Sequence, residues 1–407
     1  MKLNKSILGW IIYDFANSSF TTIIVTVVFS VYFKEKVVGN RADGTLLWSI
    51  AISLSMFLVA ISAPIFGAVA DYSRSKKKFL FIMTYVTIIF TGLLFFVDPG
   101  DILKGIVFFV IANFAFNTAN VFYNAFLPEI TTKKEIGRIS GFGWAFGYIG
   151  GLTSLLLVFP FVETNIKLTF PLVALFFLIF SIFTFFWLKE VSRPSKKTNY
   201  FKTAYKRIKK SFKNIRKIKE LQKFIISYFI YNDAIVTVIA FGAIYGKTVF
   251  DMTSRDLLIY FIIIQFSSMF GAFFFGFVLD RIGAKKTLTI TLIIWIATVI
   301  IAYVGQTINH FYLVGLLAGI AMGSSQSSSR SMLALLTPDD KKAEFFGFYA
   351  FSGKLAAISG PLAFGVVKNI TGSHRYAILS ILIFFLTGGA ILQFVNENKG
   401  KKDAETW

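Results

Sequence analysis

The chain has 407 residues, of which 56% are hydrophobic and 15% charged, and its formal net charge is +21. Apolar stretches of about 20 residues recur along it without the alternation of barrel strands, which excludes a soluble globular protein, a disordered chain and a β-barrel. The absence of cysteine excludes disulfides and thiolate sites, and neither of the two histidines belongs to a metal-ligand cluster, so we expect an integral membrane protein without metal or cofactor.

Length and flanking polar residues predict an all-α membrane protein with 12 transmembrane helices in two six-helix bundles. The helices are expected to begin near residues 7, 45, 79, 103, 139 and 168, and then near residues 221, 254, 287, 310, 344 and 374. Most of the 42 Lys and Arg residues fall in connections that are cytoplasmic if both termini are inside, so the charge reports topology and not nucleic-acid binding. The expected domains are an N-terminal bundle (1–190), a basic amphipathic linker (191–220), a C-terminal bundle (221–396) and a cytoplasmic tail (397–407).

Polar residues interrupt the first and fourth predicted helices. In "YDFANS", Asp14 and Asn17 lie about one turn apart, and an ionised side chain inside a membrane costs about 2.5–3.5 kcal/mol. The fourth helix carries an amide stripe at helical spacing, made of Asn113, Asn117, Asn120 and Asn124. We interpret both stripes as the lining of a shared aqueous interior; the alternative is polar contacts that only join helices.

A loop motif after the second helix recurs after the eighth. "GAVADYSRSKKK" contains Gly67, Asp71 and Arg74, and "GFVLDRIGAKKT" contains Gly276, Asp280 and Arg281. A carboxylate just beyond a helix end suits the positive N-terminus of another helix. Pseudo-symmetry predicts that Asp71 faces the start of the eleventh helix near Ala343, and that Asp280 faces the start of the fifth near Arg138. The alternative is a pair of solvated loop carboxylates.

The linker "YFKTAYKRIKKSFKNIRKIKEL" places apolar residues three or four apart among Lys and Arg. This pattern predicts an amphipathic helix on the anionic cytoplasmic leaflet, and the alternative is a solvated basic connection.

The second half carries its own polar positions. The seventh helix contains Tyr231, Asn232 and Asp233, and the tenth contains Gln326 and Arg330 one turn apart. Arg330 stays charged, so it requires an anion or deep water. The candidate partners are Asp14, Asp233 or a carboxylate or phosphate of a solute. A permanent ion pair that holds helices together is the alternative to solute binding. Lys354 on the eleventh helix is a second candidate cation.

The two halves repeat each other. "GFGWAFG" (141–147) corresponds to "GFYAFSG" (347–353), in addition to the duplicated loop. Such a duplication indicates pseudo-symmetric halves around a central site, which suits alternating access.

The duplicated Gly-x-x-x-Asp loop with its basic cluster resembles the signature loop of the Major Facilitator Superfamily, apart from Arg74 at a position that usually holds Gly. Within that superfamily, "YDFANSSF", "LPEITTKKEIGRISGFGWAFGYIGG", "YNDAIVT", "QSSSRS" and "FFGFYAFSGKLAAISGP" resemble the vacuole-effluxer family of autophagy-related amino-acid exporters and bacterial relatives. The resemblance implies a central cavity lined by helices 1, 4, 7 and 10, and it implies loop contacts that close one access state.

No phosphate-binding Gly-Lys-Ser/Thr loop and no nucleophile with a neighbouring base is found, so we do not expect an enzyme. We expect a monomeric secondary transporter of a small polar solute, with an amino acid or related compound favoured. Protons are the candidate coupling ion, through Asp14 and Asp233, and the bacterial inner membrane is the expected location. The alternatives are an exporter of amphipathic lipids or drug-like molecules, and a lipid scramblase.

Overall fold

The computed structural model describes residues 4–39, 44–190, 218–355 and 359–406, and every regular element in these ranges is helical. The first half contains α1 (Lys5–Ser19), the π-helix η1 (Phe20–Val27), α2 (Phe29–Tyr32), the π-helix η2 (Phe33–Val37), α3 (Gly44–Ser73), α4 (Lys76–Leu93), the 3-10 helix η3 (Leu94–Phe96), α5 (Ile102–Ile130), α6 (Ile136–Thr164), the 3-10 helix η4 (Ile166–Leu168) and α7 (Thr169–Trp187).

The second half contains α9 (Lys219–Val249), α10 (Ser254–Ile282), α11 (Ala284–Val304), α12 (Ile308–Leu336), the 3-10 helix η6 (Asp339–Lys341), α13 (Lys342–Leu355), α14 (Ser359–Thr371), α15 (His374–Gln393) and α16 (Glu397–Glu405). Local sequence sets several of these starts. Thr253 and Asp256 form a capping box at α10, and the side chains of Asn4 and Thr307 accept backbone N–H groups at α1 and α12.

Eleven helical stretches in the described residues are long and apolar enough to cross a membrane. Their starts lie within a few residues of the predicted ones. The segment predicted as the eleventh helix is described as two shorter helices, α13 and α14, with residues 356–358 outside the described ranges. The described residues therefore agree with the predicted helical membrane architecture.

Contacts divide the chain into two compact units. Unit 1 comprises Met1–Ile130, Phe146–Ile208 and Asp340–Ala350, and unit 2 comprises Thr131–Ala145, Lys209–Asp339 and Phe351–Trp407. The units differ from the sequence halves at two places, because the first part of α6 belongs to unit 2 and the first part of α13 belongs to unit 1. Each half of the sequence therefore contributes one helix start to the unit formed mainly by the other half.

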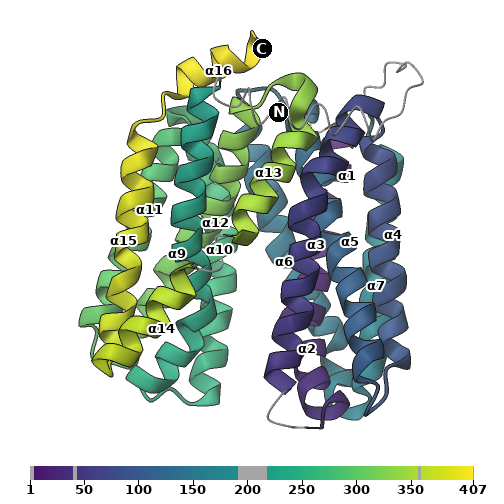
Figure 1. Ribbon diagram of the computed structural model, residues 1–407, viewed down its shortest axis with the longest axis vertical. Coiled ribbons are helices and arrows are strands. Elements are labelled where there is room, and N and C mark those ends of the chain that lie inside the picture. The colour runs from purple at the N-terminus through teal and green to yellow at the C-terminus, as the bar shows by residue number, and fades with distance from the viewer. Residues whose placement is uncertain (1–3, 40–43, 191–217, 356–358, 407) are drawn as a thin grey trace. The chain divides into compact units, whose positions relative to one another are not determined.

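The two units repeat the same helix pairings. In unit 1, α3 and α4 both pack on α5, while α1 and α4 both pack on α7. In unit 2, α10 and α11 both pack on α12, while α9 and α11 both pack on α15. Figure 1 shows α1, α4, α5 and α7 side by side, and likewise α9, α11 and α15. The duplication seen in the loop motifs therefore extends to the packing of whole helices.

Two of the predicted segments lie outside the bundles: the basic linker (191–220) and the C-terminal tail (397–407). The basic linker lies almost entirely outside the described residues, which begin again at residue 218. The predicted tail contains a helix, α16, that packs against α9 and α12. Its Gly400 lies close to Leu336 and Glu220, so this end of the chain is part of the packed unit 2.

Candidate functional site

Buried amides link three helices of unit 1. Asn113 donates to the Ser55 hydroxyl of α3 at 2.7 Å, and Asn117 donates to the Asn113 side-chain oxygen at 3.0 Å. On α1, Asn17 donates to the Asn120 side chain at 3.3 Å. These bonds satisfy polar groups that would be costly to bury alone. The structure therefore places these four amides, here called the amide row, in two hydrogen-bonded pairs: Asn113 with Asn117, and Asn17 with Asn120.

Asp14 and Asn124 lie on the same two helices as this row. Asp14 is 9% exposed, and its backbone carbonyl accepts the Ser18 hydroxyl at 2.8 Å. Asn124 is half-buried on α5. Gly147 of α6 packs closely against Ser18 and Asp14, because a Cβ there would lie 2.9 Å from the Ser18 oxygen. The acid on α1 is thus enclosed by helix packing within unit 1.

The three consecutive polar residues of α9 point in different directions. Tyr231 is fully buried, and its hydroxyl lies 2.7 Å from the Ser329 hydroxyl of α12. Asn232 donates to the carbonyl of Gly353 on α13 at 3.5 Å. Successive residues on an α-helix are about 100° apart, so three neighbours cannot line one surface. Adjacency in sequence groups Tyr231, Asn232 and Asp233 as one set, but in the structure the three side chains have different partners.

Asp233 binds the beginning of α14. Its carboxylate is fully buried and accepts the Gly360 backbone N–H, with both oxygens 2.9 Å from the nitrogen, as well as the Ser359 hydroxyl. Backbone N–H groups in the first turn of a helix have no partner within the helix, so a carboxylate is a favourable ligand for them. The absence of a side chain at Gly360 is required, because a Cβ would lie 2.1 Å from the Thr237 hydroxyl. Asp233 therefore connects α9 to the start of α14.

Arg330 is bound to the start of α6. It is 3% exposed, its Nε donates to the Ser140 hydroxyl at 2.9 Å, and one Nη donates to the Ser140 carbonyl at 2.6 Å. The guanidinium also lies over the ring of Trp144, 5.4 Å from its centroid. Gln326, one turn earlier, is half-buried. The charge of Arg330 predicts an acid or a solute as its partner, whereas the contacts with Ser140 and Trp144 could not be predicted from sequence.

The duplicated loop carboxylates lie where pseudo-symmetry predicted them. The Asp71 carboxylate accepts the Glu344 backbone N–H at 2.9 Å, and Gly67 packs directly on Ala343. The Asp280 carboxylate accepts the backbone N–H groups of Gly137 and Arg138 at 2.9 and 3.2 Å, and the Arg138 side chain at 2.8 Å. Both carboxylates thus bind helix starts.

A cluster of opposite charges surrounds Asp71. Lys76 Nζ lies 2.9 Å from an oxygen of Asp71 and 2.5 Å from one of Glu129. The backbone N–H of Lys76 in turn donates to Glu190 at 2.6 Å. Glu129 and Glu190 were missed in the sequence, because single carboxylates at helix ends carry no pattern.

The remaining loop residues and Lys354 have less defined roles. Arg74 is exposed and has a φ of 51°, in the left-handed region, and Arg281 is exposed at the end of α10. Gly276 packs against Gly137, consistent with close helix approach. Lys354 lies in α13, but its side chain is outside the described residues.

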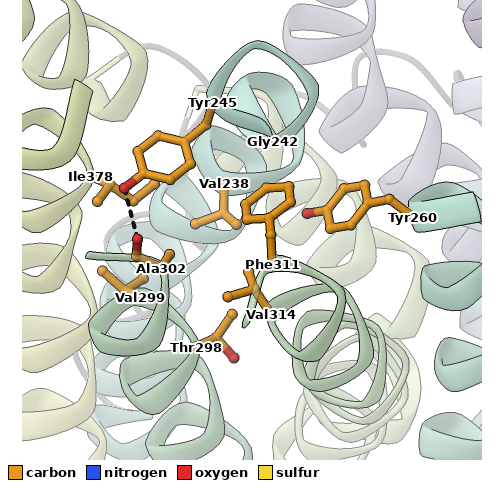
Figure 2. Close-up of a pocket in the computed structure, with 10 residues that line it drawn as sticks. All are labelled: Val238, Gly242, Tyr245, Tyr260, Thr298, Val299, Ala302, Phe311, Val314 and Ile378. Carbon is orange, nitrogen blue, oxygen red and sulfur yellow. Dashed lines mark hydrogen bonds between the residues drawn. The ribbon is translucent and has the colours of Figure 1, made fainter. Parts of the chain in front are cut away.

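A small apolar cavity inside unit 2 is too small for a solute. Its volume is about 10 Å³, and Figure 2 shows that the lining comes from α9, α10, α11, α12 and α15. Tyr245 spans part of it and donates its hydroxyl to the Ala302 carbonyl at 2.8 Å. Tyr260 and Phe311 stack with ring centroids 4.6 Å apart. Such a cavity holds about one water molecule at most, so we interpret it as a packing void.

Comparison with known proteins gives a consistent result. The family model "Vacuole effluxer Atg22 like" matches residues 36–405. The uncharacterized MFS-type transporter YxiO of Bacillus subtilis (strain 168) is 30% identical over 404 residues, which cover 96% of this chain and 94% of that protein. Autophagy-related protein 22 of Kluyveromyces lactis is 25% identical over 335 residues, covering 72% of this chain and 68% of that protein.

Solved structures share the fold at low identity. The human organic anion transporter MFSD10 has a TM-score of 0.75 at 12% identity, with 96% of this chain and 99% of that one covered. The proton:xylose symporter XylE has a TM-score of 0.72 at 13% identity, with 98% and 96% covered. Identities this low establish a shared fold and carry no information on the solute.

Proposed function

The chain belongs to the Atg22-like vacuole effluxer family of Major Facilitator Superfamily transporters, and from this premise we propose that it is a secondary transporter of a small polar solute, with an amino acid or related compound as the favoured cargo. It is an integral membrane transporter and not an enzyme. We further propose that it works by alternating access, as a monomer in a bacterial plasma membrane, with both termini cytoplasmic.

The buried amide row of unit 1 is the observation that carries this proposal. Asn113, Asn117 and Asn120 supply both donors and acceptors within the mainly apolar membrane-spanning helix α5. An amino acid presents an ammonium and a carboxylate, which need acceptors and donors respectively. A row of amides can serve both groups, whereas a lipid tail would gain nothing from it.

The proposed solute-binding residues come from five helices, α1, α5, α9, α12 and α13, and extend beyond the amide row. Arg330 is the proposed carboxylate ligand because its guanidinium forms paired hydrogen bonds. The set is Asp14, Asn17, Asn113, Asn117, Asn120, Asn124, Tyr231, Asn232, Asp233, Gln326, Arg330 and Lys354.

Proton coupling is proposed to use Asp14 and Asp233, which are buried acids on the first helices of the two halves. A carboxyl group that loses and regains water during the cycle can release and capture a proton. Asp14→Asn and Asp233→Asn should each change the pH dependence of uptake. An unaltered rate and pH profile in both variants would remove protons from the mechanism.

We also propose that the basic linker binds anionic lipid.

The test of the solute class begins with purified protein. Thermal unfolding is recorded with individual amino acids, dipeptides, sugars and lipids, because a compound that binds only the folded state raises the unfolding temperature. The hits are then measured as flux into proteoliposomes driven only by a solute or pH gradient. Stabilisation and flux by amino acids support the proposal. Stabilisation by lipids alone, or lipid movement between leaflets without a gradient, would support the alternative exporter or scramblase.

A pair of amide variants locates the binding site. Asn117→Ala removes a buried amide from the row, and Asn369→Ala removes an exposed amide from α14 as a matched control. We expect a loss of amino-acid affinity of roughly fivefold for the first and none for the second, because one hydrogen bond contributes about 1 kcal/mol. Equal affinities in both variants would exclude the row from the site.

A further inference from the structure

The first turns of α6 are held along their length by α10 and α12, all within unit 2. Gly141 packs on the Ala272 carbonyl, where an added Cβ would lie 2.4 Å from the oxygen, and Gly137 packs on Gly276 in the same way. On the α12 side, the Ser331 hydroxyl lies 3.4 Å from the Ile136 carbonyl. The absence of side chains at the two glycines lets the helices meet at backbone distance, so a small displacement of α6 would break the whole contact.

Arg330 of α12 also contacts this part of α6. Its Nε and one Nη donate to the hydroxyl and the carbonyl of Ser140, while its face lies on Trp144. The Ser140 hydroxyl donates its own proton to the Ser327 carbonyl at 2.8 Å, which leaves its lone pairs free to accept from Arg330. The guanidinium therefore contacts α6 at three groups: the Ser140 hydroxyl, the Ser140 carbonyl and the Trp144 ring.

In unit 1 the residue that corresponds to Arg330 is a neutral amide. Aligning Pro128 with Pro338, near the ends of α5 and α12, places Asn120 at the position of Arg330. Asn120 contacts α1 through Asn17. The start of α13 in unit 1 is bound by Asp71, which corresponds to Asp280, but the position of Arg330 holds a neutral amide there. The two helix starts are therefore held by unequal sets of contacts.

We propose that Arg330 is a positioning residue that latches the start of α6 onto α12, and that release of this latch is a step in the change of access state. The term latch here means the contacts of Arg330 with Ser140 and Trp144. A buried guanidinium that leaves Ser140 needs another partner, so the latch opens when a competing acceptor is available. The proposal rests on alternating access but not on the identity of the solute.

A single cysteine can report on the latch because the native chain has none. Ser331→Cys places the probe at a position that is 0% exposed against the start of α6. Thr298→Cys, 1% exposed on α11, reports on general loosening of unit 2. Each probe is combined with Arg330→Gln, Arg330→Lys and Ser140→Ala, and with Lys247→Gln as an exposed control for the loss of one positive charge. Labelling by a water-soluble maleimide is followed without solute.

Arg330→Gln should raise the labelling rate at Ser331→Cys about tenfold or more, because charged hydrogen bonds to a buried group are lost. Ser140→Ala should have a smaller effect, since the Ser140 carbonyl remains, and its effect should not add to that of Arg330→Gln. Arg330→Lys should give an intermediate rate, and the rate at Thr298→Cys should not change in any of these backgrounds.

Three outcomes would overturn the proposal or separate it from the proposed function. An unchanged rate at Ser331→Cys in Arg330→Gln would show that there is no latch. If Arg330→Gln raises labelling at both probes, the Ser140→Ala variant decides, because it keeps the positive charge of Arg330. The latch would then be rejected if Ser140→Ala does not raise the labelling rate at Ser331→Cys above that at Thr298→Cys. If labelling rises but amino-acid affinity in Arg330→Gln is native, the latch stands and the role of Arg330 as a solute ligand fails.

Discussion

At the scale of single residues, each of the duplicated loops has a residue with positive φ at the corresponding position. The second loop places Gly283 at a φ of 91°, and the first places Arg74 at a φ of 51°. The left-handed region costs a residue with a side chain roughly 1–2 kcal/mol, whereas glycine adopts it readily. Arg74, which replaces the usual glycine of the loop motif, therefore keeps a positive φ, and its backbone is strained.

Exchanging these residues should move stability in opposite directions. We expect Arg74→Gly to stabilise the protein by about 0.5–1 kcal/mol, since the relief of strain is partly offset by a more flexible unfolded chain. Gly283→Ala should destabilise it, because a Cβ would lie 3.1 Å from a Glu397 oxygen in addition to the unfavourable φ. Reversible unfolding in detergent measures both. A stability decrease in Arg74→Gly would mean that the side chain of Arg74 contributes more than its backbone costs.

Glu190 makes stability depend on pH. Burial raises the pKa of the Glu190 carboxyl above its ordinary value of 4.5, although the backbone N–H groups of Lys77 and Lys76 oppose the rise. The folded state therefore holds this proton more tightly than the unfolded state does. Its contribution to the free energy of unfolding is fully present below about pH 4.5 and is lost as the pH rises through the raised pKa.

Glu190→Gln should remove this part of the pH dependence. The free energy of unfolding of the variant should decline less than that of the native protein as the pH rises from about 4.5. Glu35→Gln, at an exposed carboxylate, serves as the control and should retain the native profile. Parallel profiles for Glu190→Gln and the native protein would mean that Glu190 does not titrate differently on folding.

At the scale of elements, α14 depends on a residue of another helix for its beginning. Asp233 accepts hydrogen bonds from Ser359 and Gly360, so the start of α14 is held by a charge on α9. A short helix gains little from its own backbone bonds and is stabilised mainly by such tertiary contacts.

Asp233→Asn should therefore loosen α14 in particular. An amide offers one acceptor oxygen in place of two, and we expect a loss of about 1–3 kcal/mol of local stability. Amide hydrogen exchange along Ser359–Thr371 should accelerate correspondingly. Gly360→Ala should produce the same acceleration through steric conflict with Thr237, whereas Asn369→Ala should not. Native exchange rates in Asp233→Asn would show that α14 is held by its other contacts.

The sequence predicted elements better than it predicted partners. Long apolar runs determine spans, and a duplicated motif determines which helix start each loop carboxylate binds, so the contacts of Asp71 and Asp280 could be predicted. The contact of Arg330 with Ser140 could not, because a serine with no special spacing gives no signal and 190 residues separate the two. The burial of an acid within an apolar segment marks Asp233 as significant, but no sequence pattern indicates its contact with Ser359 and Gly360.

At the scale of the whole molecule, each loop carboxylate should control one helix start independently. Asp280→Ala should raise labelling at Ser331→Cys, next to the start of α6. Asp71→Ala should raise labelling at Ala63→Cys, since Ala63 is fully buried against Gly347 of α13. We expect roughly tenfold increases from the loss of charged hydrogen bonds. Each variant is the control for the other, and equal increases at both probes would indicate general loosening and contradict separate gates.

The membership of the start of α6 in unit 2 affects how the protein is made. Translation delivers Gly137 and Gly141 to the membrane long before Ala272, Gly276 and Arg330 have been synthesised. The glycine face of this nascent helix therefore lacks its packing partners on α10 and α12 while a large part of the remaining chain is inserted. Contacts so distant in sequence form late, and a chain truncated after the first six helices would expose this surface permanently. The first half is consequently a poor candidate for expression as an isolated fragment, however complete its helices look.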